Sequence, residues 1–199
     1  MHHQWTKYIP ASGNREALYE EFKARALELT VKVQRVSREK ELTTAIFQVI
    51  DSLQAKRIAL PPLTLVGYHL LEEQCGQRGI HLERQLDRTE IEKADLGISE
   101  FHMAISDTGT LFQDASSLHS RLVSMLPPAH LALVKTRNLV ANMAGALEII
   151  AKVYGNKLPP YLSFVTGPSK TADIERVLTI GVHGPGDMSI IFVDQEALS

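Results

Sequence analysis

In the first half of the chain, apolar residues recur every three or four positions, which is typical of helices that bury one face. The first such stretch starts at a capping residue, Ser12 or Asn14, and continues to about Leu29. A β-branched stretch over residues 31–36 then predicts a first strand. The spacing of apolar residues likewise predicts helices over 37–53 and 64–77, and short strands over 57–60 and 80–82.

From residue 94 onward the pattern changes to short apolar runs separated by loops that contain glycine and proline. The nearly continuous apolar run over 129–135 is typical of a strand covered on both faces. The remaining predicted strands are 101–106, 110–113, 161–166, 177–182 and 188–193, and the predicted helices are 118–125 and 138–154.

Alternating strands and helices predict an α/β fold, a three-layer α/β/α sandwich with a mainly parallel sheet. We expect residues 1–36 to form an N-terminal helical lead-in with the first strand. Residues 37–199 are then expected to form a single globular α/β unit.

Composition and charge exclude several classes of protein. The 199 residues carry 21 Lys and Arg against 23 Asp and Glu, whereas a dedicated nucleic-acid binder normally carries a basic stripe. No apolar run approaches the roughly 20 residues needed to span a bilayer, and the first residues lack the apolar core of a secretory signal. With Cys75 as the only cysteine, we expect a cytoplasmic protein.

The same cysteine count bears on cofactors, because several thiolates usually hold an iron–sulfur cluster. No G-x-G-x-x-G segment occurs, and the segment around Gly167 lacks two of the glycines of a phosphate-binding P-loop. No H-E-x-x-H segment or close histidine cluster predicts zinc. We therefore expect neither a cofactor nor a metal site in this chain.

Three loops are the candidates for ligand binding: residues 107–110, 167–175 and 181–185. Each places glycine or hydroxyl residues directly after an apolar strand, so that backbone N–H groups could point at an anion. We expect them at the carboxyl ends of the parallel strands, where α/β sheets bind ligands; the alternative is tight turns that need glycine for a positive φ. The candidate ligand-binding residues are Thr108, Gly109, Thr110, Arg121, Gly167, Ser169 and Thr171.

The candidates for catalysis lie in the same loops. Asp173 and Glu175 are two carboxylates separated by one residue, which makes them candidates for general acid–base chemistry, although Asp173 could equally cap the local backbone. His183, in a glycine-rich loop, is a candidate for ligand contact or proton transfer. His130 opens an apolar strand, so we expect it to be a hydrogen-bonded structural residue.

Five segments from residue 94 onward, which include the three candidate loops, together resemble the LUD-domain family. They are ADLGIS at 94–99, AISDTGTL at 104–111, RLVSMLPPAH at 121–130, and SFVTGPSKTADIE at 163–175 continuing to GVHGP at 181–185. The resemblance implies a NagB/RpiA/CoA-transferase-like α/β/α sandwich. It also implies a part in the oxidation of L-lactate to pyruvate, alongside iron–sulfur oxidoreductase partners.

Lactate oxidation must pass two electrons to an acceptor. This chain has no sequence motif for a redox cofactor and only one cysteine, so we do not expect it to carry those electrons. The hypothesis that fits both facts is an accessory or substrate-handling subunit that is not catalytic alone. One alternative is a free-standing enzyme or binding protein for a small anionic metabolite, a carboxylate or a phosphate. The other is a purely structural subunit.

Overall fold

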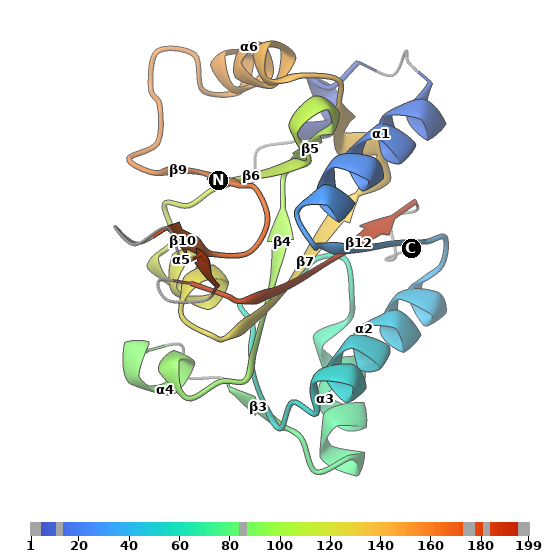
Figure 1. The fold of residues 1–199 in the computed structure, drawn as a ribbon, viewed down its shortest axis with the longest axis vertical. Coiled ribbons are helices and arrows are strands. Elements are labelled where there is room, and N and C mark those ends of the chain that lie inside the picture. The colour runs from blue at the N-terminus through green and yellow to red at the C-terminus, as the bar shows by residue number, and fades with distance from the viewer. Residues whose placement is uncertain (1–4, 11–13, 84–86, 173–177, 181–183, 195–199) are drawn as a thin grey trace.

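A six-stranded sheet forms the centre of the molecule, with all of its strands parallel (Figure 1). The computed structural model describes residues 5–10, 14–83, 87–172, 178–180 and 184–194. In sheet order, the six strands are β1 (Lys32–Val36), β12 (Asp187–Val193), β7 (Ala129–Lys135), β4 (Leu96–Phe101), β2 (Arg57–Ala59) and β3 (His81–Glu83).

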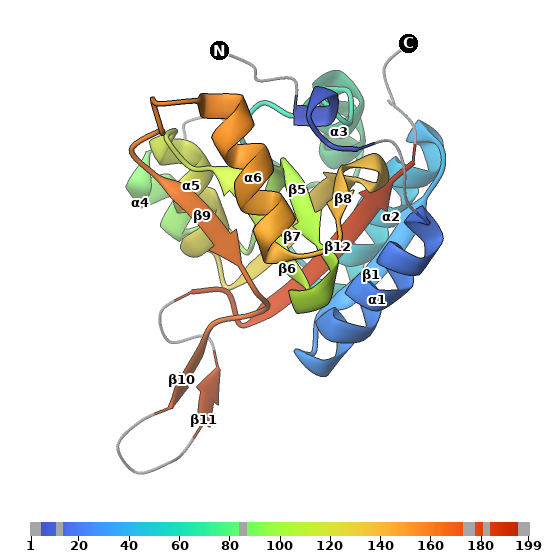
Figure 2. The same ribbon diagram turned by 90° about the horizontal axis from the view of Figure 1, so that it is seen from above.

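A second, four-stranded sheet packs over part of the first. Its strands, in order, are β8 (Leu139–Val140), β5 (Met103–Ile105), β6 (Thr110–Asp114) and β9 (Leu162–Val165). Two of its three pairings are antiparallel. A separate two-stranded hairpin, β10 (Lys170–Ala172) with β11 (Leu178–Ile180), projects from the body of the molecule (Figure 2).

Helices cover both faces of the central sheet. One face packs against α2 (Glu39–Leu53) and α3 (Tyr68–Gln77), and alternate side chains of the same strands face the other way. That second face packs against α1 (Arg15–Glu28), the smaller sheet and α5 (Leu118–Met125). The remaining helices are α4 (Arg88–Glu92), α6 (Met143–Tyr154) on the outer side of the smaller sheet, and the 3₁₀ turns Trp5–Lys7, Ser106–Thr108 and Thr136–Asn138.

The predicted fold class, an α/β sandwich with a mainly parallel sheet between helices, is confirmed. The smaller sheet is an addition that the sequence did not predict. The predicted lead-in supplies β1, which hydrogen-bonds to β12 at the edge of the central sheet.

Several boundaries differ from the prediction, and the helix predicted over 64–77 begins only at Tyr68. The single strand predicted over 101–106 is two strands in different sheets, β4 and β5, because the chain turns at His102. The helix predicted from residue 138 begins at Met143, where the side chain of Asn142 accepts a hydrogen bond from the Gly145 N–H. The strand predicted over 177–182 joins the projecting hairpin rather than the central sheet.

Candidate functional site

The loop between β5 and β6 holds the first group of candidates. After the 3₁₀ turn Ser106–Thr108, Gly109 adopts a left-handed φ of 63°. A Cβ atom on Gly109 would lie 3.0 Å from the Cβ of Arg25, so α1 packs directly against this turn. Gly109 therefore allows a tight turn with a positive φ, which was the alternative to anion binding that we considered from the sequence.

The loop after β9 lies beside this turn. The hydroxyl oxygens of Thr110 and Thr166 are 2.8 Å apart, which links the two segments through a hydrogen bond. Gly167, with a φ of 79°, approaches Leu29 at the end of α1, where an added Cβ would lie 3.1 Å from the Cβ of Leu29. The structure thus brings together two of the three predicted loops, at the end of α1.

The third loop touches the second. The backbone N–H of Ser169 donates to the Pro185 carbonyl at 2.8 Å, and a Cβ on Gly184 would lie 3.3 Å from that of Ser169. The N–H groups of Gly186 and Asp187 donate to the Pro128 carbonyl, just before β12 and β7 begin. Here the loops therefore lie at the amino-terminal edge of the parallel sheet, not at the carboxyl edge where they were expected. The reason is that the segments they follow belong to the smaller sheet and the hairpin.

Arg121 lies apart from the Thr110–Gly167 neighbourhood. Its guanidinium stacks 3.9 Å from the ring centroid of Tyr161 and donates to the Ala115 carbonyl at 2.7 Å. Both contacts are at the far end of the β6–β9 pair, whose four paired positions span roughly 10 Å. Arg121 therefore does not share a site with the threonine hydroxyls.

The catalytic candidates Asp173, Glu175 and His183 lie outside the described residues. Thr171 belongs to β10, where only its backbone is described. Whether these side chains reach the loops stays a prediction.

Two buried polar atoms mark the first loop as a place where a ligand or an ordered water would bind. The Ser106 hydroxyl and one carboxylate oxygen of Asp107 are buried and have no hydrogen-bond partner among the described residues. Leaving such groups unpaired costs about 1–3 kcal/mol each, so folded proteins normally satisfy them with protein, water or ligand. Asp107 was predicted as part of this loop, whereas Ser106 was not, and only its position next to Asp107 could have indicated it.

The carboxyl edge of the central sheet carries a second set of polar groups that sequence analysis missed. After β2 the chain continues to β3 on one side of the sheet, whereas after β4 it continues toward β7 on the other side. The crevice between two strands whose connections diverge in this way, called a switch point, is where parallel sheets usually bind ligands. There the Glu100 carboxylate accepts hydrogen bonds from the backbone N–H groups of Thr64 and Leu65, both at 2.6 Å, and from the Thr64 hydroxyl at 2.8 Å. Glu100 thus binds donors that would otherwise be available to an anionic ligand.

Asp194, which follows β12 at this same edge, is held by hydrogen bonds. Arg35 Nε donates to its carboxylate at 2.7 Å and the Ser37 hydroxyl at 3.3 Å. Burial raises the pKa of Asp194, but hydrogen bonds from these neighbours outweigh it and the pKa lies below its usual value. The carboxylate is therefore charged at neutral pH and serves to fasten β1 to β12.

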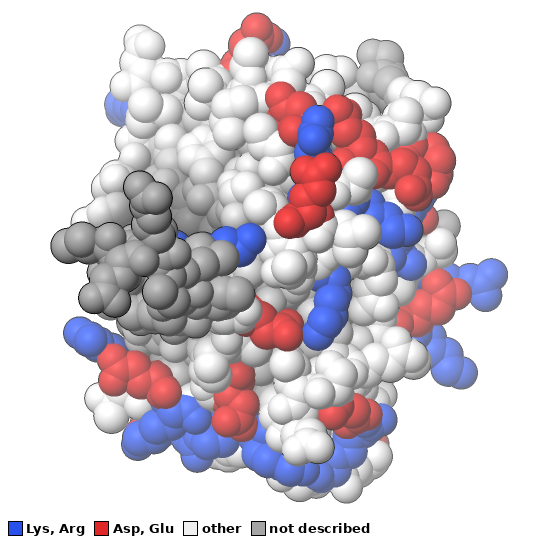
Figure 3. Space-filling model, viewed as in Figure 1, with Lys and Arg blue, Asp and Glu red and all other residues white. Residues whose placement is uncertain are grey.

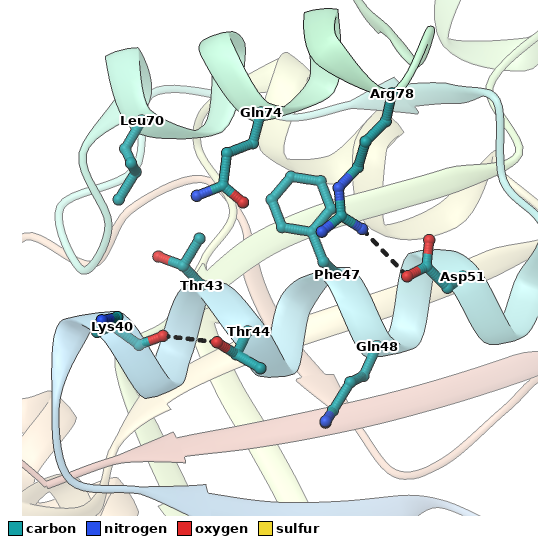
Figure 4. Close-up of a pocket in the computed structure, with 9 residues that line it drawn as sticks. All are labelled: Lys40, Thr43, Thr44, Phe47, Gln48, Asp51, Leu70, Gln74 and Arg78. Atoms are coloured by element: carbon teal, nitrogen blue, oxygen red, sulfur yellow. Dashed lines mark hydrogen bonds and ion pairs between the residues drawn. The ribbon is translucent and has the colours of Figure 1, made fainter.

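A groove of about 590 Å³ lies between α2 and α3, on the opposite face of the sheet from the loops (Figure 4). At one end the Arg78 guanidinium stacks 4.2 Å from the ring centroid of Phe47 and pairs with Asp51 at 3.1 Å. The groove is open and its lining mixes apolar and polar side chains. The lining residues are Lys40, Thr43, Thr44, Phe47, Gln48, Asp51, Leu70, Gln74 and Arg78.

His130 is a structural residue, as the sequence predicted. Its ring Nε2 lies 2.8 Å from the Ser99 hydroxyl oxygen on the neighbouring strand, and only 2% of the residue is exposed. Burial lowers its pKa to about 4, so the imidazole is neutral at physiological pH.

In the described part of the chain, no group of three or more His, Cys, Asp and Glu side chains is arranged to hold a metal ion. No helix there combines the length and the hydropathy that crossing a membrane requires.

Comparison with known proteins connects these loops to a family. The model of the LUD domain matches residues 19–193, a range that contains the three loops. A protein of Shouchella clausii (strain KSM-K16) named "Lactate utilization protein C" is 36% identical over 115 residues, which are 57% of this chain and 49% of that protein. The chain thus spans about half the length of this relative.

A relative from Deinococcus radiodurans with the same name aligns over more of the chain. It is 29% identical over 191 residues, which are 93% of this chain and 84% of that protein. A crystal structure of a DUF162 family protein from the same species superposes with a TM-score of 0.66 at 23% identity, covering 92% of this chain and 99% of that one. At this identity the superposition shows a shared fold.

Proposed function

Because the chain belongs to the LUD domain family, we propose that it takes part in L-lactate utilization as an accessory or substrate-handling subunit. In the reaction, L-lactate becomes pyruvate and gives up two electrons and two protons. We propose that iron–sulfur oxidoreductase partners accept the electrons. The observation that carries the proposal is the similarity, over 93% of the chain, to a protein named for lactate utilization.

The chemistry of the chain itself supports an accessory role. Its one thiol, Cys75, is buried in α3, and burial raises the pKa of that thiol. A protonated thiol in an apolar setting is a poor metal ligand and a poor nucleophile. The chain is therefore poorly suited to carry the electrons itself, and the partners supply that function.

The loops at the end of α1 are the candidate contact for a small carboxylate such as lactate. The hydroxyls of Thr108 and Ser169 are the donors offered to a carboxylate, since the backbone N–H groups of Asp107, Gly109 and Ser169 already donate to carbonyls of the protein. The linked Thr110 and Thr166 hydroxyls hold the two loops at a fixed separation. The buried Ser106 hydroxyl adds a donor beside them, whereas the buried Asp107 oxygen can only accept a hydrogen bond and suits the hydroxyl group of lactate rather than its carboxylate.

Genetics tests the proposal directly. A strain lacking the chain should grow poorly on L-lactate and normally on pyruvate, because only the oxidation step is lost. Complementation with wild-type protein should restore growth, whereas Thr108→Val should restore it only in part. The variant must first be shown to melt near the wild-type temperature, since a misfolded protein gives the same growth defect.

The alternative, a free-standing enzyme or binding protein for another small anion, makes a different prediction. A strain lacking the chain would then grow normally on L-lactate when no second copy of the gene compensates. That result would contradict the accessory role.

A further inference from the structure

Most exposed apolar side chains belong to three elements, α5, α6 and β9, which lie near one another in both ribbon views (Figures 1 and 2). Eight large apolar residues are exposed among those described, and six of them lie on α5, on α6 or on the segment that enters and forms β9. The six are Leu118, Met125, Leu147, Leu158, Tyr161 and Phe164. Single exposed apolar residues are ordinary, but a cluster of this kind usually marks a contact surface.

The strand β9 lies at the edge of the smaller sheet. It pairs with β6 on one side, and no described strand pairs with its other side. An exposed edge of this kind carries backbone donors and acceptors that can pair with another strand, and proteins usually protect it with charged residues.

The sequence of β9 offers no protection by charge. No charged residue occurs between Lys157 and Lys170, and prolines at 159, 160 and 168 lie outside the strand. The surface over β9 and α6, in the upper left of Figure 3, is mostly free of charged side chains. The edge is thus suited to a partner strand that is itself uncharged.

We propose that this partner is β9 of a second copy of the chain, paired antiparallel across a twofold axis. The two four-stranded sheets would then form one continuous sheet. A twofold axis places each side chain near its own counterpart, so a charged strand would repel itself. The strand β9, with the sequence LSFV, has no such charge.

The sequence of the strand also suits pairing with itself. With Ser163 on the axis, Tyr161 of one copy lies opposite Val165 of the other, and Leu162 lies opposite Phe164. Aromatic residues then face aliphatic ones on both faces of the sheet, a favourable cross-strand combination. No proline falls within the paired residues, so every backbone donor needed for pairing is present.

Helices flank the strand and enlarge the contact. The Tyr161 ring is already fixed against α5 by its stacking with Arg121, and Leu162 packs with residues of α6. Leu118 and Met125 are seven residues apart and therefore lie on one face of α5. A stable interface buries roughly 800 Å² on each partner, more than one short strand supplies. The proposed interface therefore includes these two residues, which lie on the same helix face as Arg121 and hence beside Tyr161.

The test compares two equivalent substitutions in the full chain. Phe164→Lys introduces a charge in the proposed interface, and Leu27→Lys introduces the same charge on α1, where Leu27 is 70% exposed. We expect sedimentation velocity from about 1 to about 100 µM to show a dimer for wild type and Leu27→Lys. Phe164→Lys should weaken the dimer at least about tenfold. Circular dichroism melting confirms that both variants are folded.

Amide hydrogen exchange locates the interface and does not depend on a variant. Phe164 also contacts Phe112 within the same chain, with ring centroids 5.0 Å apart, so Phe164→Lys could disturb folding. Hydrogen exchange of the wild-type chain tests the interface in that case too. We expect amides of residues 161–165 to exchange more slowly at high than at low protein concentration. A wild-type chain that stays monomeric, or a dimer whose β9 amides do not respond to concentration, overturns the proposal. So does a monomer that pairs only with a different protein at this edge.

Discussion

Burial of the His130 imidazole gives this residue a measurable effect on stability. Its pKa in the folded chain is about 4, against 6.5 for a free histidine, because the charged form would lose its hydration. Between pH 6.5 and pH 4 the unfolded chain therefore binds a proton that the folded chain does not. The stabilising contribution of neutral His130 is present above pH 6.5 and is lost as the pH falls toward 4.

We expect the free energy of unfolding to fall by about 3 kcal/mol from this residue between pH 7 and pH 4. In His130→Gln, which keeps a polar group beside Ser99 but cannot titrate, that part of the pH dependence should vanish. Urea denaturation at pH 7, 5.5 and 4.5 measures both proteins. Equal pH dependence in the two would show that another group is responsible.

The environment of a single residue was predicted correctly from the sequence where its neighbours along the chain determine that environment. A histidine opening an apolar strand was expected to be structural, and the Ser99 contact confirms it. Arg121 was harder to place, because its partners Ala115 and Tyr161 depend on how α5 lies beside β9. Such distant contacts leave no signal in the spacing of residues.

At the scale of elements, one glycine lets a helix approach a central strand. A Cβ atom on Gly97 in β4 would lie 2.0 Å from the Val123 carbonyl oxygen of α5. Gly97→Ala should therefore destabilise the protein by about 3 kcal/mol or more, because α5 must move away. Gly76→Ala in α3 is the matched control, since nothing lies within 4 Å of its added Cβ. It should stabilise the helix by about 0.5–1 kcal/mol.

Thermal melting of the two variants provides the measurement. A Gly97→Ala variant that melts with the wild type would show that α5 does not lie against β4 as described.

Glu100 holds the segment between β2 and α3 at the switch point. Glu100→Ala removes three hydrogen bonds, so the amides of Thr64 and Leu65 should exchange about tenfold faster or more. Glu100→Gln keeps an acceptor oxygen and should lose less. Amides in β7 provide an internal reference that should not change. Unaltered exchange at Thr64 in the alanine variant would contradict the role of Glu100.

Elements were predictable where hydrophobic periodicity is clear, as in α2 and β7, and less so where polar residues interrupt it. The central strand β4 carries Gly97, Ser99 and Glu100, which break the apolar run, so only its last residue was included in a predicted strand. The smaller sheet is built from strands of two to five residues, too short to show a period. Whether such segments join one sheet or two is decided by packing around them.

At the scale of the molecule, the proposed function requires that this chain carry no redox group, because its partners are proposed to accept the electrons. The purified protein should be colourless. It should contain no iron, because one buried thiol cannot replace a set of thiolate ligands, and no flavin, because the sequence has no G-x-G-x-x-G segment. Metal analysis and an absorption spectrum after gel filtration provide the measurement. A stoichiometric chromophore on the isolated chain would contradict the accessory role.

The most direct test measures L-lactate-dependent reduction of an artificial electron acceptor in extracts of a strain that lacks the chain. We expect such extracts to be inactive, purified chain to be inactive alone, and the two together to recover the activity. Recovery on mixing would show that the chain supports partners that carry the electrons. Oxidation of L-lactate by the purified chain alone, or full activity in extracts without it, would contradict the proposed function.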